Sequence, residues 1–277
     1  LTYNNFLKIV FPIKHQPSIK PCKMIPITAI IPTYNEEDGL LQALKSVQFA
    51  NEILVVDSFS TDKTLEIAES FGAKIIQREY KYSASQKNWA IPQAKHSWIL
   101  LLDADEIISK PLKIEIQNLL KSEPKESGFW IYRENFFLGK KIKYSGWQGD
   151  KVVRLFKKDE CCYEDKHVHS EIISSGKIGF LRHKIIHNTY KNFEHYLHKI
   201  ERYAEWQSKD YNKKVRTLKP YHFIIKPPFR FIKHYILQLG FLDGSVGLII
   251  SALQSYGVFL RYIHLLRLKL QHDKKRS

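Results

Sequence analysis

The sequence has little of what marks a secreted scaffold, a zinc protein or a membrane-spanning protein. Its 277 residues include three cysteines, two of them adjacent, which give neither a disulfide framework nor zinc-ligand spacing, and we expect a reducing compartment. No secretory leader pattern is visible near its start, and no run of about twenty apolar residues predicts a membrane span. With 44% hydrophobic and 26% charged residues, the composition is that of a globular protein.

Positive charge is abundant but unevenly placed. Of the formal net charge of +16, most lies in residues 182–277, which hold 19 Lys and Arg against 6 Asp and Glu. Such asymmetry indicates an anionic partner, either nucleic acid or an anionic membrane surface. No zinc-finger, recognition-helix or RNA-binding motif supports nucleic acid, and the basic third is rich in aliphatic residues. We therefore favour the membrane surface and keep a basic nucleic-acid-binding protein without catalysis as a remote alternative.

Strand and helix patterns alternate along the first half of the chain. Apolar runs predict strands, and apolar residues three or four apart predict helices. The predicted strands are 27–33, 52–57, 73–79 and 98–103, and the predicted helices are 36–47, 60–72, 83–94 and 110–121. Short connections between them predict an α/β fold with a mainly parallel sheet. Longer strands follow at 128–139 and 151–158. We expect an arm at 1–24, one α/β domain at 25–190 and a basic helical region at 191–277.

Negative charge is crowded where the fourth predicted strand ends. In WILLLDADE, five apolar residues lead directly into Asp103, Asp105 and Glu106. Packing gives no reason for this, since like charges raise one another's pKa, whereas a divalent cation would relieve the conflict. Asp-x-Asp at a strand end can hold Mg²⁺ against substrate phosphates, although acidic loops without a metal are common. Asp57 and residues 33–36 follow neighbouring strands, so three segments converge on one crevice.

Three stretches of the sequence resemble family 2 of the inverting glycosyltransferases in their order and spacing. They are IIPTYNEED, VVDSFSTDKT and QKNWAIPQAKHSWILLLDADE. The resemblance covers about residues 25–190 and implies a catalytic domain of the GT-A type, a Rossmann-like nucleotide-sugar-binding fold. Two later stretches are similar to the branch that adds glucose to lipopolysaccharide inner core. They are GFWIYRENFFLGKKIKYSGWQGDKVVRLFKK and HNTYKNFEHYLHKIERYA. The resemblance implies a UDP-sugar donor, a lipid-linked glycan acceptor and Mn²⁺ or Mg²⁺. Polyisoprenyl phosphate or another envelope polymer is the alternative acceptor.

The resemblance also implies roles for individual residues on the donor side. The nucleotide-sugar would be bound by Pro32, Thr33, Tyr34, Glu36, Asp57, Gln86, Lys87, Asn88 and Asp103. Within this set Asp57 would read the base edge and Asp103 would lie near the ribose. Asp103 and Asp105 would form the metal motif, with Asp105 the direct ligand. His187 would approach the metal or the diphosphate, or else be an ordinary buried histidine.

An inverting transfer needs a base that takes the proton from the acceptor hydroxyl. The family places this base in the stretch YEDKHVHSEI, and Asp165 is the first choice, with Glu164 second. Many relatives have Val-His-Glu there, whereas this chain has Val168, His169 and Ser170 before Glu171. A solvated turn is the alternative interpretation of the two carboxylates.

The remaining histidines and basic residues have weaker interpretations. A zinc site at His167 and His169, or at His183 and His187, is disfavoured because neither pair has a cysteine nearby. Three basic residues would face phosphates or a solvated helix face: Lys191, Lys199 and Arg202.

The C-terminal region has the spacing of a basic amphipathic helix. In VFLRYIHLLRLKL, Arg261, His264 and Arg267 recur every three residues. Such a helix can lie in the headgroup region, and we expect a peripheral enzyme on the cytoplasmic face of the inner membrane. Packing on the catalytic domain or on another copy is the alternative.

Overall fold

The structure, a computed structural model, describes residues 24–166, 170–190 and 193–274. Its first half alternates strands and helices in the order that the sequence predicts. The strands are β1 (Ile27–Thr33), β2 (Glu52–Asp57), β3 (Lys74–Gln77) and β4 (Trp98–Leu101), and the helices are α1 (Glu37–Val47), α2 (Thr64–Ser70), α3 (Ser83–Ala90), the 3-10 turn η1 (Ile91–Gln93) and α4 (Lys110–Leu119). The four strands are parallel in the order β3-β2-β1-β4, which confirms the predicted fold class.

The predicted helix over 60–72 begins only at Thr64. The residues before it form a loop whose backbone N–H groups bond to side chains after β1: Thr61 N donates to Asn35 Oδ1 at 2.9 Å and Lys63 N to Glu37 Oε2 at 3.1 Å. This loop therefore joins the carboxyl ends of β1 and β2.

The sheet continues through strands of the second half. Its path is β3-β2-β1-β4-β8-β6-β12-β5, and β7 and β11 pair with β6. These strands are β5 (Glu106–Ile108), β6 (Gly128–Phe137), β7 (Lys140–Lys141), β8 (Lys151–Lys157), β11 (Ile178–Phe180) and β12 (Ile185–Tyr190), and a separate pair is formed by β9 (Cys161–Tyr163) and β10 (Ile172–Ser174). Strands β5 and β12 are not predicted from the sequence, and their antiparallel register places His187 opposite Glu106. This pairing brings two distant parts of the site together.

The core lies on both faces of the parallel strands. Alternate residues of β1 point to opposite sides: Ile27, Ala29 and Ile31 pack with the apolar side of α1, while Ile30 packs with α3. The apolar side of α1 contains Leu40, Leu44 and Val47, all fully buried. Burial on both faces explains why these strands read as continuous apolar runs.

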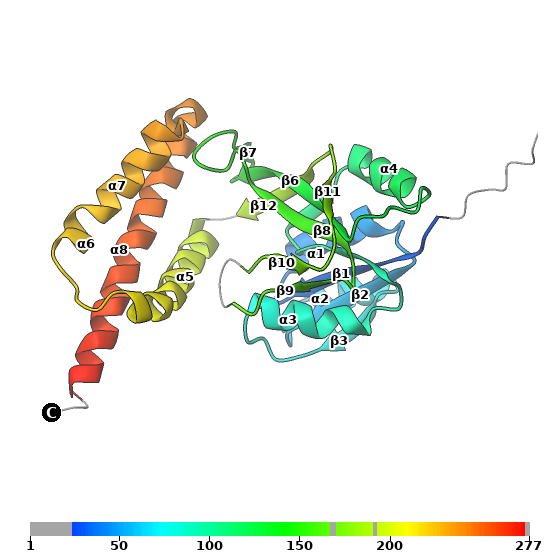
Figure 1. Ribbon diagram of the computed structural model, residues 1–277, viewed down its shortest axis with the longest axis horizontal. Coiled ribbons are helices and arrows are strands. Elements are labelled where there is room, and N and C mark those ends of the chain that lie inside the picture. The colour runs from blue at the N-terminus through cyan, green and yellow to red at the C-terminus, as the bar shows by residue number, and fades with distance from the viewer. Residues whose placement is uncertain (1–23, 167–169, 191–192, 275–277) are drawn as a thin grey trace, which may run out of the picture.

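The C-terminal region is helical, as predicted, and stands beside the sheet domain rather than on its faces (Figure 1). It contains α5 (Phe193–Lys214), α6 (Tyr221–Ile224), α7 (Lys226–Ile232), the π-helical turn η2 (Lys233–Leu237), the 3-10 turn η3 (Gly240–Asp243) and α8 (Gly244–Lys274). Helix α8 packs along α5 and α7. The predicted arm lies, except for Met24, outside the described residues.

A loop of the sheet domain holds the helical region in place. The carboxylate of Asp243 accepts hydrogen bonds from the backbone N–H groups of Lys143 and Tyr144, both at 3.0 Å, and from Ser145 Oγ at 2.8 Å. His234 Nδ1 lies 2.8 Å from the Ser145 carbonyl oxygen. Gly146 has a φ of +86°, and a Cβ there would meet the ring of His234 at 2.9 Å. We call these contacts the Asp243 clamp.

Among the described residues, one helical stretch is long and apolar enough to cross a membrane by length and composition. It runs from Gly240 to Gln271, and 28% of its most apolar part is buried inside the protein. The sequence itself predicts no span there, since it contains no uninterrupted run of about twenty apolar residues.

Candidate active site

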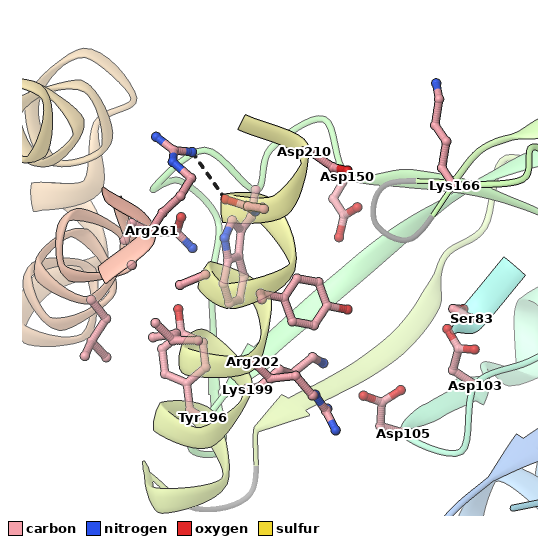
Figure 2. A pocket seen from close by; sticks show the side chains of 18 of the residues that line it. Ser83, Asp103, Asp105, Asp150, Lys166, Tyr196, Lys199, Arg202, Asp210 and Arg261 are labelled. Atoms are coloured by element: carbon pink, nitrogen blue, oxygen red, sulfur yellow. Dashed lines mark hydrogen bonds between the residues drawn. The ribbon is translucent and has the colours of Figure 1, made fainter. Parts of the chain in front are cut away.

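A cleft of about 2160 Å³ runs from the carboxyl ends of the parallel strands to the C-terminal helices. Its lining includes Thr33 of β1, Asp103 and Asp105 after β4, and residues of α5, α7 and α8. Figure 2 shows Asp103 and Asp105 on one side of this cleft, with Lys199 and Arg202 extending from α5 toward Asp105. Ligands of open α/β sheets bind at this edge, so the cleft is the candidate active site.

Asp103 is held by two cations. Lys87 Nζ lies 2.9 Å from Asp103 Oδ1, and the guanidinium of Arg154 contacts Oδ2. Burial raises the pKa of Asp103, but the charges of Arg154 and Lys87 outweigh it, and the pKa lies well below its ordinary value. Asp103 is therefore a carboxylate at neutral pH.

Glu106 has a structural position that the sequence analysis does not assign. Its side chain is fully buried and lies between two arginines: Oε1 is 2.7 Å from Arg154 Nη2 and 3.3 Å from Arg133 Nη1. Its other oxygen accepts a hydrogen bond of 3.1 Å from the backbone N–H of Asp103. The carboxylate of Glu106 thus holds the backbone of Asp103 in place. Arg154 stands inside the apolar strand KVVRLFK, a signal that could have predicted a buried counter-ion.

A chain of hydrogen bonds orients His187 toward Asp105. Arg133 holds Asp150 through Nε and Nη2, at 2.9 and 2.6 Å, and Asn135 Nδ2 donates to Asp150 Oδ2 at 2.8 Å. The oxygen of Asn135 is therefore the atom that faces His187 Nδ1 at 2.6 Å, so Nδ1 carries the proton. His187 Nε2 then lies 3.5 Å from Asp105 Oδ2.

Asp105 is the second carboxylate of the motif. Burial raises its pKa, but a protonated His187, which donates a hydrogen bond and carries positive charge, outweighs burial and holds the pKa below the ordinary value. Once Nε2 has lost its proton, His187 instead presents a lone pair toward the carboxylate oxygen. Two electron-pair donors that face each other fit a cation between them.

The donor-side residues divide into two groups. Seven of them line the cleft: Pro32, Thr33, Tyr34, Glu36, Gln86, Lys87 and Asp103. Asp57 is fully buried, and its carboxylate accepts from Gln77 Nε2 at 2.9 Å and from Ser60 Oγ at 2.5 Å. Asn88 bonds both backbone groups of Tyr163, each at 2.8 Å. Asp57 and Asn88 thus hold the walls of the cleft in this structure.

The two candidate bases differ in position. Asp165 lines the cleft and accepts a hydrogen bond of 2.5 Å from the hydroxyl of Tyr82, which raises the pKa of that tyrosine. Glu164 pairs with Lys166 Nζ at 2.5 Å. Asp165 therefore has the better access to a ligand in the cleft.

The zinc hypotheses find no support within the described residues. No group of three or more His, Cys, Asp or Glu side chains in the described part of the chain could hold a metal ion by itself. His183 instead faces Glu115, with Nδ1 2.9 Å from Oε2. His167, His169 and Lys191 lie outside the described residues.

Comparison with known proteins places this site in a family. Residues 28–162 match the family model described as glycosyl transferase family 2. The uncharacterized glycosyltransferase RT0209 of Rickettsia typhi is 27% identical over 90% of this chain and 89% of its own. The lipopolysaccharide core biosynthesis glycosyltransferase LpsC of Rhizobium meliloti is 23% identical over 86% of this chain and 93% of its own.

A solved structure supports the same fold. The mannosyltransferase PcManGT from Pyrobaculum calidifontis, in complex with GDP-Man and Mn²⁺, has a TM-score of 0.51 and 15% identity, with 88% of both chains covered. The family match and the relatives confirm the predicted family, and the solved structure shows the fold. This chain is therefore a glycosyltransferase that carries a family 2 domain of the GT-A fold at residues 28–162.

Proposed function

We propose that this chain is a metal-dependent, inverting hexosyltransferase that moves glucose from a UDP-sugar to a lipid-linked glycan such as lipopolysaccharide inner core. The acceptor class is supported by the similarity to LpsC, whose name assigns it to lipopolysaccharide core biosynthesis. The donor class is supported by the lining of the cleft, where Thr33, Tyr34 and Gln86 stand beside the acidic motif.

The observation that carries the proposal is the pair formed by Asp105 and His187. Their facing oxygen and nitrogen atoms, 3.5 Å apart, fit Mn²⁺ or Mg²⁺, which need few protein ligands when substrate phosphates supply the rest. PcManGT was solved with Mn²⁺. When bound, the cation supplies Lewis-acid chemistry that neutralises the charge on a departing nucleoside diphosphate.

The charges around the site fit a diphosphate ligand. The four carboxylates of Asp103, Asp105, Glu106 and Asp150 lie among the cationic side chains of Lys87, Arg133 and Arg154, and Lys199 and Arg202 extend toward Asp105 from α5. These cationic side chains, together with a divalent cation, would make the cleft attractive to a diphosphate. Lys87 lines the cleft, so it can contact the diphosphate as well as Asp103.

The remaining chemical step is proton removal from the acceptor hydroxyl. Asp165 supplies the base: its carboxylate lines the cleft, and the hydroxyl of Tyr82 fixes one oxygen through a hydrogen bond. The other oxygen can accept the proton as the hydroxyl attacks the sugar from the side opposite the nucleotide, which inverts the anomeric centre.

A panel of UDP-sugars tests the donor and the metal. The melting temperature should rise when UDP-glucose and Mn²⁺ are added together. Asp105→Ala should abolish the part of this rise that depends on Mn²⁺. The matched control is Asp159→Ala, which removes an exposed carboxylate outside the cleft. A metal-dependent shift that survives in Asp105→Ala would contradict the metal assignment.

Transfer to a lipopolysaccharide core acceptor tests the base. Asp165→Asn should leave donor binding intact while transfer falls at least a hundredfold, the lower end of about 10²–10⁴ for general-base catalysis. Glu164→Gln is the comparison, because its side chain pairs with Lys166. Normal transfer by Asp165→Asn would show that the base lies elsewhere.

We further propose that the helical region lies on the cytoplasmic face of the inner membrane. Large apolar side chains are exposed along α6, α7 and η2: Ile224 is 70% exposed, Phe229 59% and Leu237 66%. The region around them is strongly basic, which suits an anionic leaflet. A crossing of the bilayer by α8 is disfavoured because α5, which packs along it, carries charged pairs such as Glu205 and Lys209.

Vesicle flotation tests the membrane surface. Burial of an exposed Ile or Leu contributes about 1.5–3 kcal/mol, so the partly exposed Ile224 and Leu237 should each contribute roughly 1–2 kcal/mol. The double variant Ile224→Ser/Leu237→Ser should therefore bind anionic vesicles at least tenfold more weakly. The matched control is Ile114→Ser/Ile173→Ser, whose residues are 59% and 54% exposed on the sheet domain. Equal loss in both variants would contradict the assignment.

A further inference from the structure

Three cationic side chains of α7 and α8 line the end of the cleft farthest from the sheet. Lys226 and Arg230 come from α7 and Arg261 from α8, and all three line the same cleft as Asp103 and Asp105. Figure 2 shows Arg261 reaching toward α5, where its Nη1 lies 3.2 Å from Gln207 Oε1. We call these three residues the helical cation cluster.

The partners of the cluster within the protein are all neutral. Arg230 Nη2 lies 3.3 Å from Gln254 Oε1, and Lys226 Nζ lies 2.9 Å from the hydroxyl of Tyr262. No carboxylate of the described residues lies within 4.0 Å of any of the three cations. The Nε atoms of Arg230 and Arg261 are buried without a hydrogen-bond partner among the described residues.

Aromatic rings keep the cations close together. The guanidinium of Arg261 lies 4.1 Å from the ring centre of Tyr211 and 5.0 Å from that of Tyr262, and Lys226 Nζ lies 5.1 Å from the ring of Tyr262 on which both converge. These contacts orient the charges but do not neutralise them.

The electrostatic cost of this arrangement is visible at Arg230. Burial lowers the pKa of Arg230, and the positive charge of Arg261 lowers it further. Arg133 and Arg154, beside the acidic motif, differ in this respect, because each contacts carboxylates and has a raised pKa. A partly buried cluster of like charge without a counter-ion is unfavourable unless an anion occupies it.

We infer that Lys226, Arg230 and Arg261 form a second anion-binding subsite, which takes a phosphate group carried by an amphiphilic molecule. Guanidinium groups present forked N–H donors that match phosphate oxygens. Apolar side chains line the cleft beside the cations, namely Phe229, Leu253 and Val258, so the phosphate can be attached to a hydrocarbon group. The subsite lies in the same cleft as Asp103 and Asp105. The inference rests on the function proposed for that cleft, and the subsite would bind the acceptor rather than the sugar donor.

The phosphate has two possible sources, the glycolipid acceptor or a phospholipid headgroup. Both offer the same chemistry to the cluster. The acceptor would place its phosphate there while its sugar hydroxyl reaches Asp165, and a headgroup would instead fix the helices on the bilayer. The experiment therefore needs one arm for the subsite and one for the source.

The first arm is calorimetric titration of the full chain with inorganic pyrophosphate in the absence of divalent metal. Arg230→Gln and Arg261→Gln should each weaken binding about tenfold or more, the loss expected for a charge-assisted hydrogen bond. Arg182→Gln is the matched control, since it removes the same charge from an exposed position outside the cleft and should leave affinity unchanged. Unchanged affinity in both cluster variants would overturn the inference.

The second arm measures binding of the same variants to phosphatidylcholine vesicles with and without phosphatidylglycerol. If the cluster variants lose vesicle binding as strongly as pyrophosphate binding, the phosphate is that of a headgroup. If they bind vesicles like the wild type, it is that of the acceptor. The two variants lie on different helices, so one remains a test if the other does not fold. The titration contains neither donor nor metal, and its result is therefore independent of whether Asp105 and Asp165 transfer sugar.

Discussion

Replacing Glu106 by glutamine should destabilise the protein more than the removal of any exposed carboxylate. Glu106 is fully buried and is shared by Arg133 and Arg154, while its second oxygen accepts the backbone N–H of Asp103. Glutamine keeps the shape and one acceptor oxygen but removes the charge. The two arginines then keep only the carboxylates of Asp103 and Asp150.

The expected magnitude follows from the burial of the pair. Breaking a buried ion pair by removing one partner costs about 3–5 kcal/mol, because the other charge stays buried. Asp103 and Asp150 still compensate the arginines in part, so we expect the lower end, about 3 kcal/mol. A change of 1 kcal/mol shifts the melting temperature of a domain this large by roughly 2–4 °C, and the variant should melt about 6–12 °C lower.

Urea unfolding followed by circular dichroism measures this loss directly. Glu69→Gln is the control, since its carboxylate is exposed on α2 and should matter by less than about 0.5 kcal/mol. The double variant Glu106→Gln/Arg154→Gln should be less destabilised than the sum of its single variants, because it leaves fewer buried charges unpaired. If Glu106→Gln unfolds at the same urea concentration as Glu69→Gln, the buried carboxylate does not organise the acidic loop as argued.

Two further predictions concern the Asp243 clamp. Asp243→Asn places an N–H₂ group against backbone N–H donors and should cost about 1–3 kcal/mol in urea unfolding, whereas Asp159→Asn should cost almost nothing; equal midpoints would contradict the clamp. His234 should make stability depend on pH: burial lowers its pKa from the ordinary 6.5, so the unfolded chain binds the proton more strongly and stability falls as the pH drops below about 6.5. The loss should be smaller in His234→Gln, and an equal fall in melting temperature between about pH 7.5 and 5.5 in both proteins would assign the effect to other groups.

The parallel half of the fold could be predicted from the sequence because its signals are local. Strands buried on both faces read as apolar runs, and the boundaries of β1 and β2 agree with the prediction. Strands β5 and β12 were missed because they are short or polar and are defined by pairing with each other across many residues of chain. Pairing of that kind leaves no periodic pattern in either segment.

In the candidate site, too, some residues could be predicted from local sequence and others could not. Asp103 and Asp105 stand out because three carboxylates follow an apolar strand. Asn135 and Asp150 orient His187, and this role depends on three-dimensional contacts that no motif contains. Asp57 was predicted to read the base, but its full burial and its bonds to Ser60 and Gln77 could not be foreseen from its place at a strand end. Its role in binding stays a prediction.

The Asp243 clamp has a consequence for the geometry of the acceptor. Because Asp243 and His234 tie the helices to the loop at 143–146, the helical region cannot turn freely against the sheet domain. If the exposed side chains of α6 and α7 rest in the lipid as proposed, the height of Asp165 above the bilayer is fixed as well. Glycans whose reactive hydroxyl stands nearer to or farther from the lipid would then miss the carboxylate, so the enzyme would select its acceptor by the length of sugar chain already built.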